Sequence, residues 1–301
     1  MSTEALPQKP TDPVTPHVPG VDDSATPRSP RGDTGRGRNL ALGLWTALAL
    51  TFLLAPILFM IVFSFNDNQG RFNFEWQGFT LKHWGDPFQN PDLAKALQNS
   101  LSIAVLTTIA ATMLGTLLAI ALVRHRFRGR TSADFFVFLP MASPEVVMGA
   151  SLLAMFLVLG IGTGYVTILL AHIMFSISYV VVTVKSRLEG MDPHIEEAAR
   201  DLGANEVTTF FRVTLPMIAP GVAAAAVLAF ALSIDDYVIT SFNAGQTQTF
   251  PLFIFGATRQ GVPPQVNVLS TMLLVLVLLL MLGNVLLQRR LAKRDRISQA
   301  G

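Results

Sequence analysis

The chain has 301 residues, of which 51% are hydrophobic and only 14% charged, with a formal net charge of +2. Soluble domains carry about a quarter charged residues, so this composition predicts a membrane protein and gives no basis for a nucleic-acid surface. The chain contains no cysteine, which excludes disulfides, thiolate metal sites and cysteine nucleophiles.

Residues 1–39 are rich in Pro, Gly, Ser, Thr and Asp, and this composition predicts a disordered tail. Four arginines lie just before the first apolar run and predict that this end is cytoplasmic. The run from Leu40 to Phe63 is long enough for a span, which needs about 20 apolar residues. No small-residue cleavage site follows it, so we expect an uncleaved helix in which Pro56 introduces a kink.

The segment from Asn66 to Leu97 is polar but rich in aromatic residues, and we expect it to be an outer loop. Aromatic residues are typical of a membrane interface, although they would also suit a docking surface for a partner. A second span is predicted from Ser100 to Val123, followed by four arginines in a cytoplasmic loop. The third span is predicted from Phe135 to Leu159 and the fourth from Tyr165 to Val184, with a tight outer turn between them.

The segment from Lys185 to Pro216 is polar, whereas both of its flanks are long and apolar. Its pattern predicts two short helices joined by a turn at Gly203, since glycine reaches left-handed backbone angles without a Cβ clash. Pro216 is expected to end the second helix. The first helix would present small side chains and the second would present aromatic ones, which together suit the groove of a partner. The alternative is an ordinary amphipathic loop between two spans.

This segment resembles the coupling loop of the permease subunits of ATP-binding-cassette importers. That loop has the pattern Glu-Ala-Ala, three residues, Gly, nine residues, Ile, any residue, Leu-Pro. The chain matches it with Val213 in place of Ile and with these other residues: Glu197, Ala198, Ala199, Gly203, Leu215 and Pro216. The resemblance implies that Glu197 and its neighbours contact a separate cytoplasmic ATPase dimer. ATP and Mg²⁺ would bind there, since this chain has no GxxxxGK[ST] loop.

A fifth span is predicted from Met217 to Phe242, an outer loop from Asn243 to Asn267, and a sixth span from Val268 to Leu287, before a basic tail over 289–301. The proposed outer side carries only Arg71, Lys82, Lys95 and Arg259, and all other Lys and Arg residues fall on the inner side. The positive-inside rule therefore predicts an all-α membrane protein with six spans in residues 40–288 and both termini in the cytoplasm.

Three acidic residues fall inside predicted spans: Glu145 in the third, and Asp235 and Asp236 in the outer half of the fifth. A charge at the centre of a span costs about 2.5 to 3.5 kcal/mol, so such residues usually face a polar path. Adjacent helical residues point about 100° apart. In one arrangement, one Asp lines the path while the other caps a helix or pairs with another group. In a second, the helix unwinds at this point. In a third, both carboxylates lie at the outer mouth of the helix and contact only water. Glu145 could instead cap a half-helix that begins after Pro144.

The run from Ala229 to Phe242, with later matches around Phe250 and Gly261, resembles the spermidine/putrescine branch of these permeases. The resemblance implies a type I importer fold in a bacterial cytoplasmic (inner) membrane. Two permease subunits, often non-identical, would sit on the ATPases and receive substrate from an extracytoplasmic binding protein. Carboxylates beside an aromatic residue such as Tyr237 would suit an extended polycation. The expected substrate path thus comprises Glu145, Asp235, Asp236 and Tyr237.

Three other functions stay open at this point. An importer of another solute, such as an iron complex, a sugar, an amino acid or an anion, would have the same coupling loop, although intramembrane acids argue against an anion. A secondary transporter or channel usually has internal repeats and more spans. A membrane enzyme needs a catalytic constellation, and the five scattered histidines supply neither this nor a metal-ligand spacing. His172, in the fourth span, is the one histidine that merits a test.

Overall fold

The computed structural model describes residues 35–70, 72–192 and 194–298. Most of the predicted disordered tail, residues 1–34, lies outside these ranges. Helix α1 (Gly35–Phe63) includes the last residues of that tail and has Pro56 within it. The described residues fall into two compact units, divided between Ala55 and Pro56.

The described residues form helices joined by loops, together with one isolated β-bridge between Asn66 and Phe79. Five of these helices are long and apolar enough to cross a membrane, and a sharply bent pair brings the number to six. The prediction of an all-α membrane protein is therefore confirmed. The long helices that follow α1 are α3 (Pro91–Arg124), α6 (Tyr165–Glu189), α9 (Leu215–Ile234) and α12 (Pro264–Ser298).

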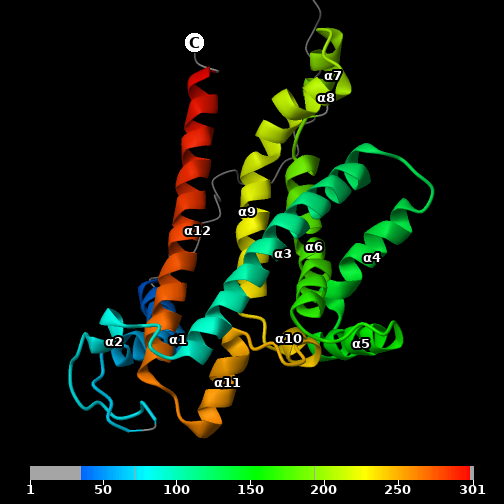
Figure 1. Cartoon of the computed structure of the whole chain (residues 1–301). Coiled ribbons are helices and arrows are strands. Elements are labelled where there is room, and N and C mark those ends of the chain that lie inside the picture. Colours follow the sequence, from blue (N-terminus) through cyan, green and yellow to red (C-terminus); the bar gives the residue numbers. More distant parts are fainter. Residues whose placement is uncertain (1–34, 71, 193, 299–301) are drawn as a thin grey trace, which may run out of the picture. The chain divides into compact units, whose positions relative to one another are not determined.

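Helices α3, α6 and α9 pack side by side and form the centre of the second unit (Figure 1). Their buried positions are mainly small or β-branched residues, among them Ala111, Ala225 and Val180. Gly115 of α3 lies so close to α6 that an added Cβ would be 2.7 Å from a methyl carbon of Val180. Small residues let helix backbones approach closely where lipid provides no hydrophobic driving force for association.

The third predicted span, from Phe135 to Leu159, is not a single straight helix, so this prediction is wrong in its geometry. The segment forms α4 (Arg130–Ala142) and α5 (Glu145–Val158), which meet at an angle of 110°. Ser143, between them, has an extended backbone with ψ of 139°. The residue before a proline is driven out of the helical region by a clash with the proline ring, so Pro144 causes this break.

The fifth span is also interrupted. Helix α9 ends at Ile234, and a short helix α10 (Val238–Asn243) follows after Asp235, Asp236 and Tyr237. The unwound helix that the acidic pair suggested is therefore present. Broken helices of this kind supply the binding sites of many transporters.

The predicted coupling segment forms α7 (His194–Asp201), α8 (Glu206–Thr209) and a π-helical turn η1 (Phe210–Thr214) that runs directly into α9. The prediction that Pro216 ends a helix is wrong. In the π turn, the Leu215 N–H donates to the Phe210 carbonyl, five residues back. This wider turn lies immediately before Pro216, which has no N–H to donate. The helix continues through Pro216.

Several loops are shorter than predicted because helices extend into them. Helix α3 begins at Pro91, where the Asn90 side chain accepts hydrogen bonds from the N–H groups of Asp92 and Leu93. The first outer loop thus ends well before Leu97 and contains α2 (Lys82–Gly85), and the second contains α11 (Phe250–Gln260). Within the second unit, α7 and α8 lie at one end of the bundle, and α5, α10 and α11 lie at the other (Figure 1).

Candidate functional site

Two regions carry the sequence-predicted functional residues, one at each end of the bundle. At the first, α7 ends in a turn at Gly203, whose φ is +87°. The Gly203 N–H donates to the Arg200 carbonyl at 2.8 Å, and the Ala204 N–H donates to the Ala199 carbonyl at 3.1 Å. This is the hydrogen-bond pattern of a Schellman motif, which requires a left-handed residue at this position. The predicted glycine turn is confirmed in its backbone geometry.

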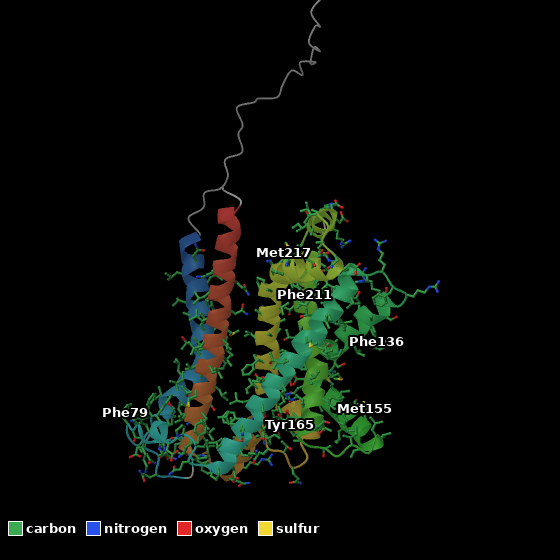
Figure 2. All side chains as sticks on the ribbon, turned by 45° about the horizontal axis from the view of Figure 1, so that its top comes forward. Phe79, Phe136, Met155, Tyr165, Phe211 and Met217 are labelled. Carbon is green, nitrogen blue, oxygen red and sulfur yellow. The ribbon has the colours of Figure 1, made fainter. Side chains whose placement is uncertain are left out.

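Residues on both sides of this turn present an apolar surface. The Asn205 side chain accepts a hydrogen bond from the Thr208 N–H at 2.8 Å and so caps α8. Leu202 is 91% exposed, Val207 66% and Phe211 60%. Figure 2 labels Phe211 near the end of the bundle that carries α7 and α8. Side chains this apolar and this exposed favour a partner protein over contact with water.

The polar face of α7 is also exposed, and some of the predicted coupling residues are accessible. The Glu197 side chain is 62% exposed and lies 3.0 Å from Nδ1 of His194, a hydrogen bond that raises the pKa of His194, with further contributions from the charges of Asp192 and Glu197. Ala198 and Pro216 are exposed as well, whereas Ala199 and Leu215 are half-buried.

A neighbouring acid that sequence reasoning did not single out behaves differently. Glu196 is buried, and its carboxylate lies 3.0 Å from the guanidinium of Arg124 and accepts a hydrogen bond from the Thr214 hydroxyl at 2.8 Å. The sequence shows only that two glutamates precede Ala198. It does not indicate which of the two carboxylates faces the bundle.

The second region is the break between α9 and α10, where Asp236 is a buried structural acceptor. Its Oδ2 accepts hydrogen bonds from the Thr240 N–H at 2.8 Å and from the Thr240 hydroxyl at 2.7 Å. The carboxylate thereby satisfies one of the N–H groups that the first turn of α10 leaves without an intrahelical partner. Asp236 is therefore the member of the acidic pair that caps α10.

His172 of α6 completes this polar cluster. Its Nε2 lies 3.2 Å from Oδ2 of Asp236 and 2.9 Å from Oγ1 of Thr240, and its Nδ1 lies 2.8 Å from Oγ of Ser233. The imidazole thus joins the end of α9 and the start of α10 to α6. Spacing alone did not identify Ser233 or Thr240, although the four-residue interval from Asp236 to Thr240 is a local hydrogen-bonding distance on a helix.

Asp235 points elsewhere. It is exposed and borders an open pocket of about 520 Å³ that is lined by α9, α11 and α12. Most of the cavity wall is apolar, and Tyr237 and Phe255 also contribute to it. The rings of these two residues lie 4.7 Å apart between centroids, and the guanidinium of Arg259 stands 5.1 Å from the centre of the Phe255 ring. A carboxylate beside aromatic faces is an arrangement that binds cations.

Glu145 lies in the first turn of α5, directly after the break at Pro144. A carboxylate at a helix N-terminus interacts favourably with the helix dipole, so the capping interpretation of Glu145 has a structural basis. Its side chain is exposed, and it lies within electrostatic range of Asp235. The structure therefore brings the three predicted acids to one end of the bundle, with one buried and two accessible.

The arrangement of helices matches those of known importer permeases. A bacterial alginate ABC transporter, solved with an alginate pentasaccharide-bound periplasmic protein, matches with a TM-score of 0.63 at 19% identity, covering 87% of this chain and 97% of the other. The MetNI methionine ABC transporter matches with a TM-score of 0.55 at 14% identity, covering 66% and 95%. The fold is that of a multi-pass permease subunit of an ABC importer.

The chain belongs to the family described as binding-protein-dependent transport system inner membrane component, whose profile matches residues 111–296. It is similar to the spermidine/putrescine transport system permease protein PotC of Escherichia coli, with 44% identity covering 84% of this chain and 95% of that protein. PotC of Haemophilus influenzae is 41% identical over 79% and 93%. The putrescine transport system permease protein PotI of E. coli is 40% identical over 75% and 83%.

Proposed function

We propose that this chain is a membrane-spanning, non-catalytic permease subunit that imports polyamines across a bacterial inner membrane. ATP is bound and hydrolysed, with Mg²⁺, on a separate cytoplasmic ATPase dimer. A second permease subunit completes the path, and an extracytoplasmic binding protein delivers the substrate. Both termini lie in the cytoplasm, as the distribution of Lys and Arg supports.

The observation that carries the proposal is the position of Asp235. Its carboxylate is accessible, borders an apolar cavity with Tyr237 and Phe255, and lies within electrostatic range of Glu145. An extended polycation requires carboxylates for its ammonium groups and apolar or aromatic surface for the methylene segments between them. The relatives named for spermidine and putrescine support the same substrate class.

Coupling to ATP hydrolysis is assigned to α7, the Gly203 turn and the start of α9. Glu197, Ala198 and the apolar side chains that follow are exposed at the end of the bundle opposite the acidic cluster. A partner that binds there can displace α9 directly, because the chain runs from α8 through η1 into α9 without a loop. Movement at the ATPase would thus reach the Asp235 break at the far end of the same helix.

Uptake of radiolabelled spermidine and putrescine tests this function in cells that lack the chain and in the same cells complemented with it. Glycine betaine, iron citrate and maltose serve as control solutes. We expect complementation to restore polyamine uptake and to leave the control solutes unchanged. Polyamine uptake that is equal with and without the chain would refute the substrate, and restored uptake of a control solute would identify an importer of another class.

A further inference from the structure

Two adjacent glutamates on α7 have opposite environments. Glu196 is 7% exposed, whereas the Glu197 side chain is 62% exposed. Successive residues on a helix point about 100° apart, so one carboxylate faces the bundle while the other faces away from it. The coupling segment therefore contains an inward-facing acid whose role is separate from contact with the ATPase.

The contacts of Glu196 join three elements. Its Oε1 lies 3.0 Å from Nη2 of Arg124, the last residue of α3, and accepts a hydrogen bond from the hydroxyl of Thr214, the last residue of η1. Its Oε2 lies 3.9 Å from Nη2 of Arg200, which is more exposed. Arg124 and Glu196 are 72 residues apart, so this is a long-range link between the coupling helix and the bundle core.

Helix α7 has little else to hold it on α3. It has eight residues, and isolated helices shorter than about 12 to 15 residues are marginal in water. Its main packing contacts are with α8 and η1. Among the described residues, no other hydrogen bond or ion pair joins α7 to α3. The direct polar link between α7 and α3 is thus one partly buried ion pair.

The surroundings of the pair offer the guanidinium no other acceptor among the described residues. A cavity of about 330 Å³ is bordered by Arg124, Glu196, Thr209 and neighbouring side chains. Nε of Arg124 and the hydroxyl of Thr209 are buried here without a protein hydrogen-bond partner. The guanidinium is therefore paired with Glu196 alone, so the position of Arg124 depends on that of Glu196.

We propose that Glu196 and Arg124 form a positioning pair that ties the coupling helix to α3. A displacement of α7 then moves α3 through the ion pair and α9 through the continuous chain, so that two core helices respond together. The inference rests on the proposed coupling role of α7, but the position of α7 on α3 can be measured without transport. Neither residue contacts the ATPase or the substrate in this account.

The absence of native cysteines makes a direct measurement possible. Spin labels at Asp201→Cys, the last residue of α7, and Leu117→Cys, about two turns before the end of α3, report the distance between these elements by pulsed electron resonance. Both native residues are exposed. The sample is the complete transporter, assembled with cysteine-free partner subunits in nanodiscs without nucleotide.

We expect one narrow distance distribution in the otherwise unaltered chain. Glu196→Gln and Arg124→Gln should each broaden it, and the double variant should broaden it no further, because either change removes the same link. Arg200→Gln is the matched control and should leave the distribution unchanged. A native distribution in the Glu196→Gln protein, or further broadening in the double variant, would overturn the proposal.

Transport measurements on the same proteins separate the two proposals. In Glu196→Gln, we expect uptake per ATP hydrolysed to fall at least about fivefold, the lower end of typical coupling between two sites, with assembly intact by size-exclusion chromatography. Unchanged distances, together with loss of coupling in a Gly203 variant, would refute the positioning pair but retain the coupling role. Broadened distances in a chain that neither binds an ATPase nor transports would retain the link but refute the proposed function.

Discussion

Nε2 of His172 lies 3.2 Å from Oδ2 of Asp236, so that α6 and the break between α9 and α10 share one buried polar contact. The two side chains are only 4% and 8% exposed. In a low-dielectric interior, a carboxylate is stable only when it is paired or hydrogen-bonded. The pair therefore fixes where α9 ends, and with it the direction in which the adjacent Asp235 points.

His172→Leu should destabilise the protein by about 1 to 3 kcal/mol, because it leaves Ser233 without its buried partner and removes one of the polar contacts of Asp236, which keeps those from Thr240. Thermal unfolding of the purified chain in detergent checks this expectation. His125→Leu, which changes an exposed histidine after α3, is the control. Equal unfolding temperatures for the two variants would show that the His172 contact contributes nothing to stability.

Asp235→Asn and Asp236→Asn should have different effects despite their adjacency. Asp235 is accessible and borders the apolar cavity, so its replacement should lower polyamine uptake and leave thermal unfolding unchanged. Asp236 accepts two hydrogen bonds from Thr240, so its replacement should lower the unfolding temperature as well. Uptake kinetics and thermal unfolding, measured on both variants, test whether Asp235 acts in transport and Asp236 in stability. Unaltered uptake in Asp235→Asn would remove this residue from the substrate path.

Substitutions at Gly203 should separate backbone strain from charge. An added Cβ meets no atom within 4 Å, so the cost comes from the left-handed backbone at φ of +87°, which a β-branched residue strongly resists. We expect Gly203→Val to uncouple uptake from ATP hydrolysis and Gly203→Asn to retain coupling. Gly203→Asp should fall between them, because a negative charge at the end of α7 opposes the helix dipole. If uptake stayed fully coupled to ATP hydrolysis in Gly203→Val, the turn would have no role in coupling.

The close packing of α3 against α6 predicts a position-specific cost. Gly115→Ala should destabilise the protein by about 1 to 3 kcal/mol, since the new Cβ would lie 2.7 Å from Val180 and 3.3 Å from the Ile177 carbonyl oxygen. Gly283→Ala in α12 is the matched control, because no atom lies within 4 Å of its added Cβ. There the change should be neutral or stabilising, as alanine favours helix. Thermal unfolding of both variants gives the comparison.

The outer loop should loosen in mild acid because of His83. Burial lowers the pKa of His83, the charge of Lys82 lowers it further, and Asp67 partly opposes both. A histidine with a lowered pKa in the folded state stabilises the fold above its unfolded value of about 6.5 and loses that contribution as the pH falls toward the folded pKa. Hydrogen exchange of residues 72–90 at pH 7.5 and 5.5 should show faster exchange at pH 5.5. His83→Gln should abolish the difference.

Features that depend on hydrophobicity and local chemistry could be predicted from the sequence. The lengths of the apolar runs predicted the positions of the long helices, since a bilayer requires about 20 apolar residues in a row. Gly203 marked its turn because few other residues adopt left-handed angles. The spacing from Glu197 to Pro216 predicts a coupling segment, which lies within the residues that match the family profile.

The different roles of neighbouring acidic residues could not be predicted from the sequence, because they depend on long-range packing. Asp235 and Asp236 are adjacent and chemically identical, as are Glu196 and Glu197, and in each pair one carboxylate is buried and one accessible. Their burial depends on partners far along the chain, His172 and Arg124, which no local pattern connects to them. The break at Pro144 and the continuation through Pro216 likewise differ because proline's effect depends on the backbone around it, extended at Ser143 and π-helical before Leu215.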